Sequence, residues 1–198
     1  MKLVTSFLLA FGALSASAAA INKRDAFHLY AYGTGIGGLP VYYSDGKAYV
    51  GKNVPNGSKV NANITCTTPF FTTLSFSLLS SHTTNALAVT PTTNNDWVIT
   101  PTNPNVTIPN SPALYIEPST AALTNVGFTD DGKGETSGFL LYGNWAMWKG
   151  YTTEQLASNF YATPVEGCDN VFSLMWNEGQ QDDGKSISVA VRKLAPST

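Results

Sequence analysis

The stretch from Phe27 to Val50, FHLYAYGTGIGGLPVYYSDGKAYV, constrains the fold more than any other part of the chain. Its segment Gly33–Gly38 matches the G-x-G-x-x-G fingerprint of dinucleotide-binding folds, which requires a helix directly after the glycines. Leu39–Tyr43 follows instead, a β-branched and aromatic run containing a proline, and Asp45-Gly46 then favours a tight hairpin. The glycines therefore predict a loop between paired strands, and not a nucleotide site. The strands expected here cover residues 27–32, 39–43 and 47–50.

The first 24 residues have the pattern of a secretory leader. Met1-Lys2 is followed by the apolar run Leu3–Leu14 and by Ala16-Ser-Ala18, which predicts a signal peptide over residues 1–18 cleaved after Ala18. Lys23-Arg24 predicts a dibasic processing site that ends a short pro-segment over residues 19–24, although two solvated charges on a frayed terminus are the alternative. Residues 25–198 are then expected to form a single domain of a secreted protein, extracellular or associated with a cell wall.

The charge balance excludes some partners. Removing the leader takes three of the 11 basic residues and none of the 13 acidic ones, which leaves a net charge of −5. An acidic surface without a basic cluster repels a phosphate backbone, so we expect no nucleic-acid partner. No further apolar run reaches the ~20 residues of a membrane helix, so we expect no membrane span.

The chain has two cysteines, Cys66 and Cys168, and a secreted protein passes through an oxidising compartment. We therefore expect a Cys66–Cys168 disulfide, whose long loop would stabilise the fold by about 4–5 kcal/mol in the chain-entropy model. A reactive thiol is the alternative. Three Asn-x-Ser/Thr sequons, at Asn56, Asn63 and Asn105, predict N-glycosylation and hence exposed positions.

The rest of the chain alternates short strand-like runs with turns. Thr152 and Gln155 have capping-box spacing, which predicts a short helix reaching about Ser158. Five prolines in residues 91–113 indicate a long surface connection with one edge strand at 96–100. The other expected strands cover residues 60–65, 70–78, 86–90, 114–117, 126–129, 137–148, 160–162, 171–176 and 186–193. Gly143-Asn144 interrupts residues 137–148 and indicates a bulge or a tight hairpin there.

Asp-Gly-Lys occurs three times, starting at Asp45, Asp131 and Asp183, each time between strand-like runs. Asp-Gly is favoured in hairpin turns that need positive φ, and no acidic cluster here has the ligand spacing of a calcium loop. We interpret these repeats as turns and expect no metal. Many short strands with Gly and Pro turns predict an all-β fold, an antiparallel β-sandwich of jelly-roll type with at most one short helix.

Enzymatic chemistry has few candidate residues. The two histidines, His28 and His82, are too few for a three-histidine metal site, and no G-x-S-x-G elbow is present. Two carboxylates would suffice for a glycosidase or lyase, and Glu117 and Glu178 are the acids that adjoin strongly apolar strand ends. They are the catalytic candidates if the protein is an enzyme, and no cofactor is expected.

Aromatic residues gather in one segment that contains Tyr142, Trp145, Trp148 and Tyr151. In a strand, Trp145 and Trp148 point to opposite faces because their positions differ by an odd number. One indole is expected in the core and the other on the surface, where it could bind a glycan or a protein. Core packing of both, with a bulge between them, is the alternative.

Four segments, FHLYAYGTGIGGLPVYYSDGKAYVG, SGFLLYGNWAM, FYATP and FSLMWN, resemble a largely uncharacterised group of small secreted proteins from filamentous ascomycete fungi. The resemblance covers most of the chain after Arg24. It implies a fungal source and secretion, and it transfers no catalytic residues.

We therefore expect a secreted, non-enzymatic, effector-like or binding protein. Its partner would be an extracellular glycan or protein, at the fungal wall or on a host. A carbohydrate-active enzyme with two carboxylates and a structural wall protein are the alternatives.

Overall fold

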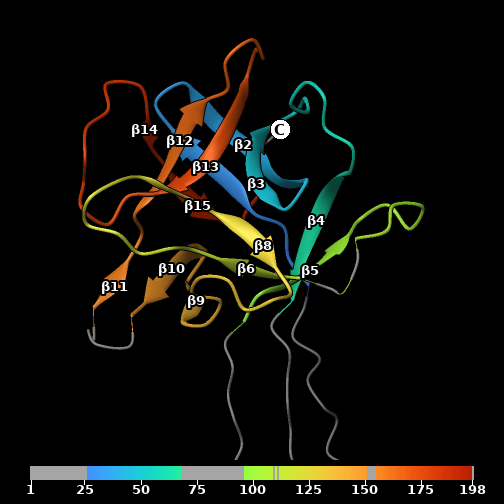
Figure 1. The fold of residues 1–198 in the computed structure, drawn as a ribbon, viewed down its shortest axis with the longest axis horizontal. Helices are drawn as coiled ribbons and strands as arrows, with labels where there is room; N and C mark the ends of the chain where they lie inside the picture. Colours follow the sequence, from blue (N-terminus) through green and yellow to red (C-terminus); the bar gives the residue numbers. More distant parts are fainter. Residues whose placement is uncertain (1–25, 68–95, 109, 111, 151–154, 198) are drawn as a thin grey trace, which may run out of the picture.

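The computed structural model describes residues 26–67, 96–108, 110, 112–150 and 155–197 (Figure 1). These residues form antiparallel strands and contain no helix, which confirms the all-β prediction. Every strand expected within the described residues has an observed counterpart, whereas those expected at 70–78 and 86–90 lie outside them. The strands are β1 (Tyr30–Gly33), β2 (Ile36–Ser44), β3 (Lys47–Gly51), β4 (Asn61–Thr67), β5 (Val98–Pro101), β6 (Ala113–Tyr115), β7 (Thr124–Asn125), β8 (Gly127–Thr129), β9 (Phe139–Tyr142), β10 (Trp145–Lys149), β11 (Leu156–Ala157), β12 (Phe160–Pro164), β13 (Val171–Trp176), β14 (Ile187–Ser188) and β15 (Ala190–Arg192).

Hydrogen bonds join all these strands into one sheet, in the order β11-β10-β15-β1-β2-β4-β5-β6-β8-β3-β13-β12-β14, with β7 and β9 attached at its side. Strand β2 links its parts, because it pairs with β1 through its first half and with β3 and β4 through its second half. The sequence predicted two separate sheets packed as a jelly-roll sandwich. The pairing does not confirm that arrangement.

The glycine-rich stretch forms two consecutive hairpins. The turn between β1 and β2 consists of Thr34-Gly35, so the predicted loop is shorter than expected and Ile36–Gly38 belongs to β2. A register shift between Ala31 and Tyr32 leaves Gly38 (φ 76°) against the Tyr32 ring, where a Cβ would approach a ring atom to 2.8 Å. The close approach of this ring explains one glycine of the fingerprint without any nucleotide.

Asp45 (φ 45°) and Gly46 (φ 83°) form the predicted two-residue turn between β2 and β3. The Asp45 carboxylate also accepts hydrogen bonds from the backbone N–H groups of Lys59 and Val60, both at 2.9 Å. These two bonds hold the pKa of Asp45 below its usual value. This carboxylate therefore ties the hairpin to the chain entering β4.

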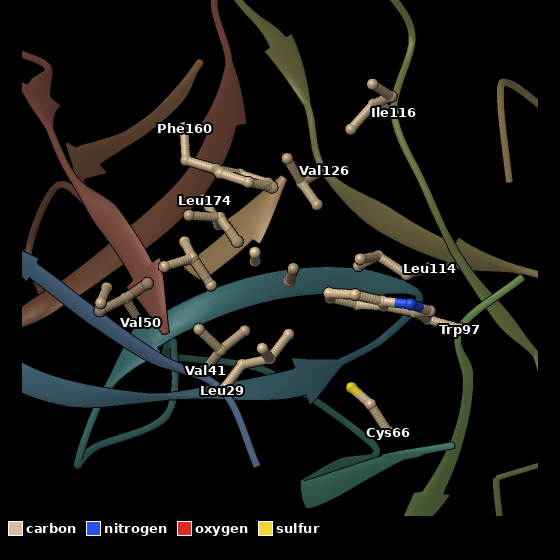
Figure 2. Close-up of a cluster of buried hydrophobic side chains, with 14 of the residues drawn as sticks. Leu29, Val41, Val50, Cys66, Trp97, Leu114, Ile116, Val126, Phe160 and Leu174 are labelled. Carbon is tan, nitrogen blue, oxygen red and sulfur yellow. The ribbon is translucent and has the colours of Figure 1, made fainter. Parts of the chain in front are cut away.

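The buried apolar side chains form one hydrophobic core between the strands, and Figure 2 shows part of it. Inward side chains alternate along the chain at every second position, as in Leu29 and Ala31 at the start of β1 and in Val189 and Val191 at β15. Trp97 and Trp176 are its largest fully buried members. The core fixes which side chains of each strand face outward, and the candidate site consists of those.

Two local predictions were wrong. Leu156–Ala157 pairs with the end of β10 instead of continuing a helix from Thr152, which itself lies outside the described residues. Strand pairing satisfies the backbone along β10 and overrides the weak capping signal. Strand β5, expected at an edge, pairs with β4 along its length and with β6 at Val98.

Within the described ranges, no helix has the length and apolar character needed to cross a membrane.

Candidate functional site

A tight hairpin between β9 and β10 places two aromatic side chains on the surface. Gly143 (φ 61°) and Asn144 form its two-residue turn, so Tyr142 and Trp145 lie directly opposite each other on one face of the pair. Tyr142 is 67% exposed and Trp145 is 42% exposed, whereas most large apolar side chains described here are buried. The turn chemistry in the sequence thus positions an exposed aromatic pair.

Arg192 of β15 fixes the orientation of Trp145. The two residues are register partners, and the Arg192 guanidinium lies 4.1 Å from the centre of the Trp145 ring and 5.1 Å from that of Tyr32. Its Nε is buried, and the described surroundings offer it no hydrogen-bond partner. The cation is therefore held between two aromatic rings, a contact worth about 0.5–1 kcal/mol at an exposed site. Tyr32 in turn donates a hydrogen bond to the carbonyl of Leu194 (2.8 Å).

Trp148 belongs to the core and not to this surface. It is 8% exposed, its ring meets Trp176 edge-on at 5.7 Å, and its Nε1 donates to the carbonyl of Ser137 at 3.0 Å. The parity argument correctly predicts that the two indoles point to opposite faces. The burial of Trp148 removes this residue from the candidate ligand-binding residues. Tyr151 lies outside the described residues.

The exposed pair continues as a row across three further strand positions. Tyr142 pairs with Trp145, Trp145 with Arg192, Arg192 with Tyr30, and Tyr30 with Pro40. Residues in direct register lie on the same face of a sheet, and neighbouring strands are about 4.8 Å apart. From Trp145 to Pro40 the row therefore spans three strand spacings, about 14 Å. We call the surface of Tyr142, Trp145, Arg192, Tyr32 and Tyr30 the aromatic face.

At Pro40 the row meets a cleft of about 360 Å³, which we call the asparagine cleft. It lies between β2, β4 and the segment after β3, and its volume is at the lower end of the range for ligand pockets. A second cleft, of about 340 Å³, adjoins it and shares Lys52 and Asn53. The asparagine cleft is lined by Pro40, Tyr42, Gly51, Lys52, Asn53, Val54, Asn61, Ala62 and Asn63. Sequence reasoning missed both clefts.

Tyr42 holds the wall of the asparagine cleft in place. Its hydroxyl donates a 2.6 Å hydrogen bond to the carbonyl of Asn53, and its ring stacks on Tyr49 at 6.0 Å. Burial, together with the neighbouring Tyr49, raises the pKa of Tyr42 to about 12, so the phenol remains a donor at physiological pH. On the neighbouring strand β4, Asn61 accepts a 2.7 Å hydrogen bond from the Ser44 hydroxyl. These bonds give the cleft a fixed shape.

The catalytic candidates lie elsewhere. Glu117 forms an ion pair with Lys133, at 3.5 Å between Oε1 and Nζ, and both side chains are largely exposed. Glu178 is partly buried after the end of β13. Neither glutamate lines either cleft described here. The two candidates therefore lie outside both clefts and outside the aromatic face.

The other Asp-Gly repeats form loops and not hairpins. The Asp131 carboxylate accepts from the Thr129 hydroxyl and the Lys133 N–H, and both bonds lower its pKa. Asp183 accepts from the N–H groups of Ser186 (2.7 Å) and Lys185 (2.9 Å). These carboxylates satisfy backbone donors of their own turns. The described residues contain no group of three or more potential metal ligands.

The predicted disulfide is absent, since both cysteines are free thiols. Cys66 of β4 is fully buried, and its backbone pairs with Phe27 and with Ile99 of β5. Cys168 lies in the turn between β12 and β13, where its N–H bonds to the carbonyl of Val165. Cys66 thus belongs to a strand pairing, whereas Cys168 lies in a turn outside the paired strands. Burial raises the pKa of the Cys66 thiol to about 12, which also argues against a reactive thiol there.

The three sequon asparagines are exposed, as glycosylation would require. Asn56 lies in the loop between β3 and β4, and its Nδ2 donates to the carbonyl of Gly167 at 3.2 Å. Asn105 lies in the loop after β5. Asn63 differs from both because it lies within β4 and lines the asparagine cleft.

Comparison of the chain with protein-family models, with curated proteins and with solved structures finds no match. The fold and the site therefore define the class, an antiparallel all-β protein that presents an aromatic face beside a polar cleft.

Proposed function

We propose that this chain is a secreted, non-enzymatic, effector-like binding protein of a fungus, and that the aromatic face binds an extracellular glycan at the fungal wall or on a host. The observation that carries the proposal is the exposed Trp145 ring, held by Arg192 at 4.1 Å opposite an exposed Tyr142. A fixed aromatic ring loses little side-chain entropy when a ligand binds. The apolar C–H face of a pyranose stacks on such a ring, and the neighbouring Tyr and Arg groups offer donors to its hydroxyls.

The length of the row supports an extended ligand. Pro40 belongs both to the row of residues that starts at Tyr142 and to the wall of the asparagine cleft. A chain of sugars that stacks on Trp145 would run along this row as far as Pro40, about 14 Å away. A single sugar would contact only one end of the surface.

The test is a pull-down of the purified protein on insoluble chitin, β-glucan and cellulose, with the supernatant assayed for released sugar. We expect binding to at least one polysaccharide without release of sugar. Trp145→Ala should weaken that binding about tenfold or more, equivalent to at least 1.4 kcal/mol. Leu156→Ala is the matched control, because Leu156 is 38% exposed and pairs at the far end of β10.

Equal binding by the wild type and Trp145→Ala would refute the role of the aromatic face. Absence of binding to all three polysaccharides would refute the glycan and favour a protein target, for which Trp, Tyr and Arg are also common anchors. Release of oligosaccharide that Glu117→Gln or Glu178→Gln abolishes would establish the alternative, a carbohydrate-active enzyme.

A further inference from the structure

The asparagine cleft contains a modification site of its own. Asn63, the acceptor of the Asn-Ile-Thr sequon, lines this cleft, whereas Asn56 and Asn105 do not. All three asparagines are exposed, so each is accessible to a glycosyltransferase. A glycan on Asn63 would begin at the wall of a cavity, and a glycan on either of the other two would begin on a loop.

The geometry of β2 and β4 determines what the first sugar would meet. Asn63 is the direct register partner of Tyr42, and side chains in direct register have Cβ atoms about 4.5–5.5 Å apart. Pro40, Val54, Ala62 and the edge of Tyr42, which is 4% exposed, form the apolar part of the lining. Val54 is 48% exposed, which is unusual for a large apolar side chain in this fold.

The polar part of the lining fits the substituents of N-acetylglucosamine. Asn53 and Asn61 carry amide groups that can pair with an acetamido group or with ring hydroxyls, and Lys52 adds a donor. The Tyr42 hydroxyl is occupied by Asn53 at 2.6 Å and the Asn61 Oδ1 by Ser44 at 2.7 Å. These bonds fix the walls of the cleft before any sugar enters it.

We propose that the N-glycan on Asn63 folds back into the asparagine cleft, so that the protein's own N-acetylglucosamine core is the ligand of this cleft. The cavity of about 360 Å³ has room for a small ligand and not for a branched glycan, so the outer mannose residues remain in solvent. The inference rests on the secretory route in the proposed function, because N-glycosylation occurs only there. The cleft is then a structural glycan site, and the aromatic face is the surface that remains for an external partner.

The experiment uses the full chain secreted from a eukaryotic host, with occupancy at each sequon read by mass spectrometry. An endoglycosidase that cuts between the two N-acetylglucosamine residues is then applied to the native and to the denatured protein. We expect the native glycan on Asn63 to be cleaved about tenfold or more slowly than those on Asn56 and Asn105, a difference equivalent to 1.4 kcal/mol. After denaturation the three rates should be equal. Val54→Ser should accelerate native cleavage at Asn63 alone.

A stability measurement provides the second readout. Asn63→Gln should lower the melting temperature of the secreted protein by about 2–4 °C, the shift typical of a modest loss in a chain of this size. Asn56→Gln and Asn105→Gln should not. In protein made in bacteria, without glycans, Asn63→Gln should have no effect, which separates the glycan from the asparagine side chain.

The failures are distinguishable. Equal native cleavage at all occupied sequons, or an unmodified Asn63 beside a glycosylated Asn56 or Asn105, would overturn the cleft proposal and leave secretion intact. Retention of the chain inside the cell with all three sequons bare would overturn both the cleft proposal and the proposed secretion.

Discussion

Replacing Trp148 by alanine should destabilise the protein strongly, because the indole lies in the core and carries a hydrogen bond. Truncation of a buried Trp costs about 3–5 kcal/mol through lost transfer energy and the cavity that remains. Trp148 is 8% exposed and packs edge-on against Trp176 at 5.7 Å. The free energy of unfolding of a typical domain is only about 5–15 kcal/mol, so this loss is a large part of the stability of the fold.

Two further variants separate the contributions. Trp148→Phe keeps an aromatic ring but removes the donor to the Ser137 carbonyl (3.0 Å), so it should cost about 1–3 kcal/mol for an unsatisfied buried group. Trp145→Ala is the matched control three positions away. Trp145 is 42% exposed and its ring stacks on the Arg192 guanidinium, so the loss in free energy of unfolding should be below about 1 kcal/mol.

The assay is urea unfolding followed by far-UV circular dichroism, with the midpoint and slope fitted for each variant. The order of stability should be wild type, then Trp145→Ala, then Trp148→Phe, then Trp148→Ala. If the free energy of unfolding of Trp148→Ala is less than about 1 kcal/mol below that of the wild type, this indole is not in the core. The assignment of Trp145 as the surface member of the pair would then lose its basis.

Three further outcomes are expected. Hydrogen bonds from backbone N–H groups of its own turn lower the pKa of Asp183 from its usual 3.8 to about 2. The ionised carboxylate therefore stabilises the fold at pH values above 3.8, and this stabilisation is lost as the pH falls towards 2. The melting temperature of Asp183→Asn should therefore be below that of the wild type at pH 5 and converge with it near pH 2. In thiol titration of the native protein, Cys168 should react, and the buried Cys66 should react only in denaturant. If neither thiol reacts in denaturant until a reductant is added, the two cysteines form a disulfide after all. Gly51→Ala should lower the urea midpoint, because φ there is 149° and a Cβ would lie 2.5 Å from a backbone carbonyl oxygen, and an unchanged midpoint would show that the strands can separate without cost.

The predictions that succeeded depend on local chemistry. Asp45-Gly46 and Gly143-Asn144 each supply residues that tolerate positive φ, and both form two-residue hairpins. Because the second turn contains no extra residue, the alternation of faces along β10 is unbroken from Trp145 to Trp148. The sequence therefore predicts one surface indole and one core indole correctly.

The predictions that failed depend on which distant strands pair. The capping signal at Thr152 is local, but Leu156–Ala157 pairs with β10 and the sheet determines its conformation. Two cysteines and a secretory leader suggest a disulfide, but Cys66 lies in the paired strand β4 and Cys168 in the turn between β12 and β13. No local signal in the sequence reveals that. Sequence spacing alone cannot bring two sulfurs within bonding distance.

The aromatic face shows how a site can arise from strands whose separate patterns are ordinary. Arg192 is the last residue of β15, and the alternation of that strand predicts only that its side chain faces outward. The same holds for Tyr30, the first residue of β1, near the other end of the chain. Because β15 inserts between β10 and β1, the arginine lies between aromatic rings that come from both neighbours. A guanidinium stacks on such rings through its planar face, which an ammonium lacks. Arg192→Lys would keep the charge and the strand pairing, so any loss of glycan binding in that variant must come from the lost stacking that holds Trp145 in place.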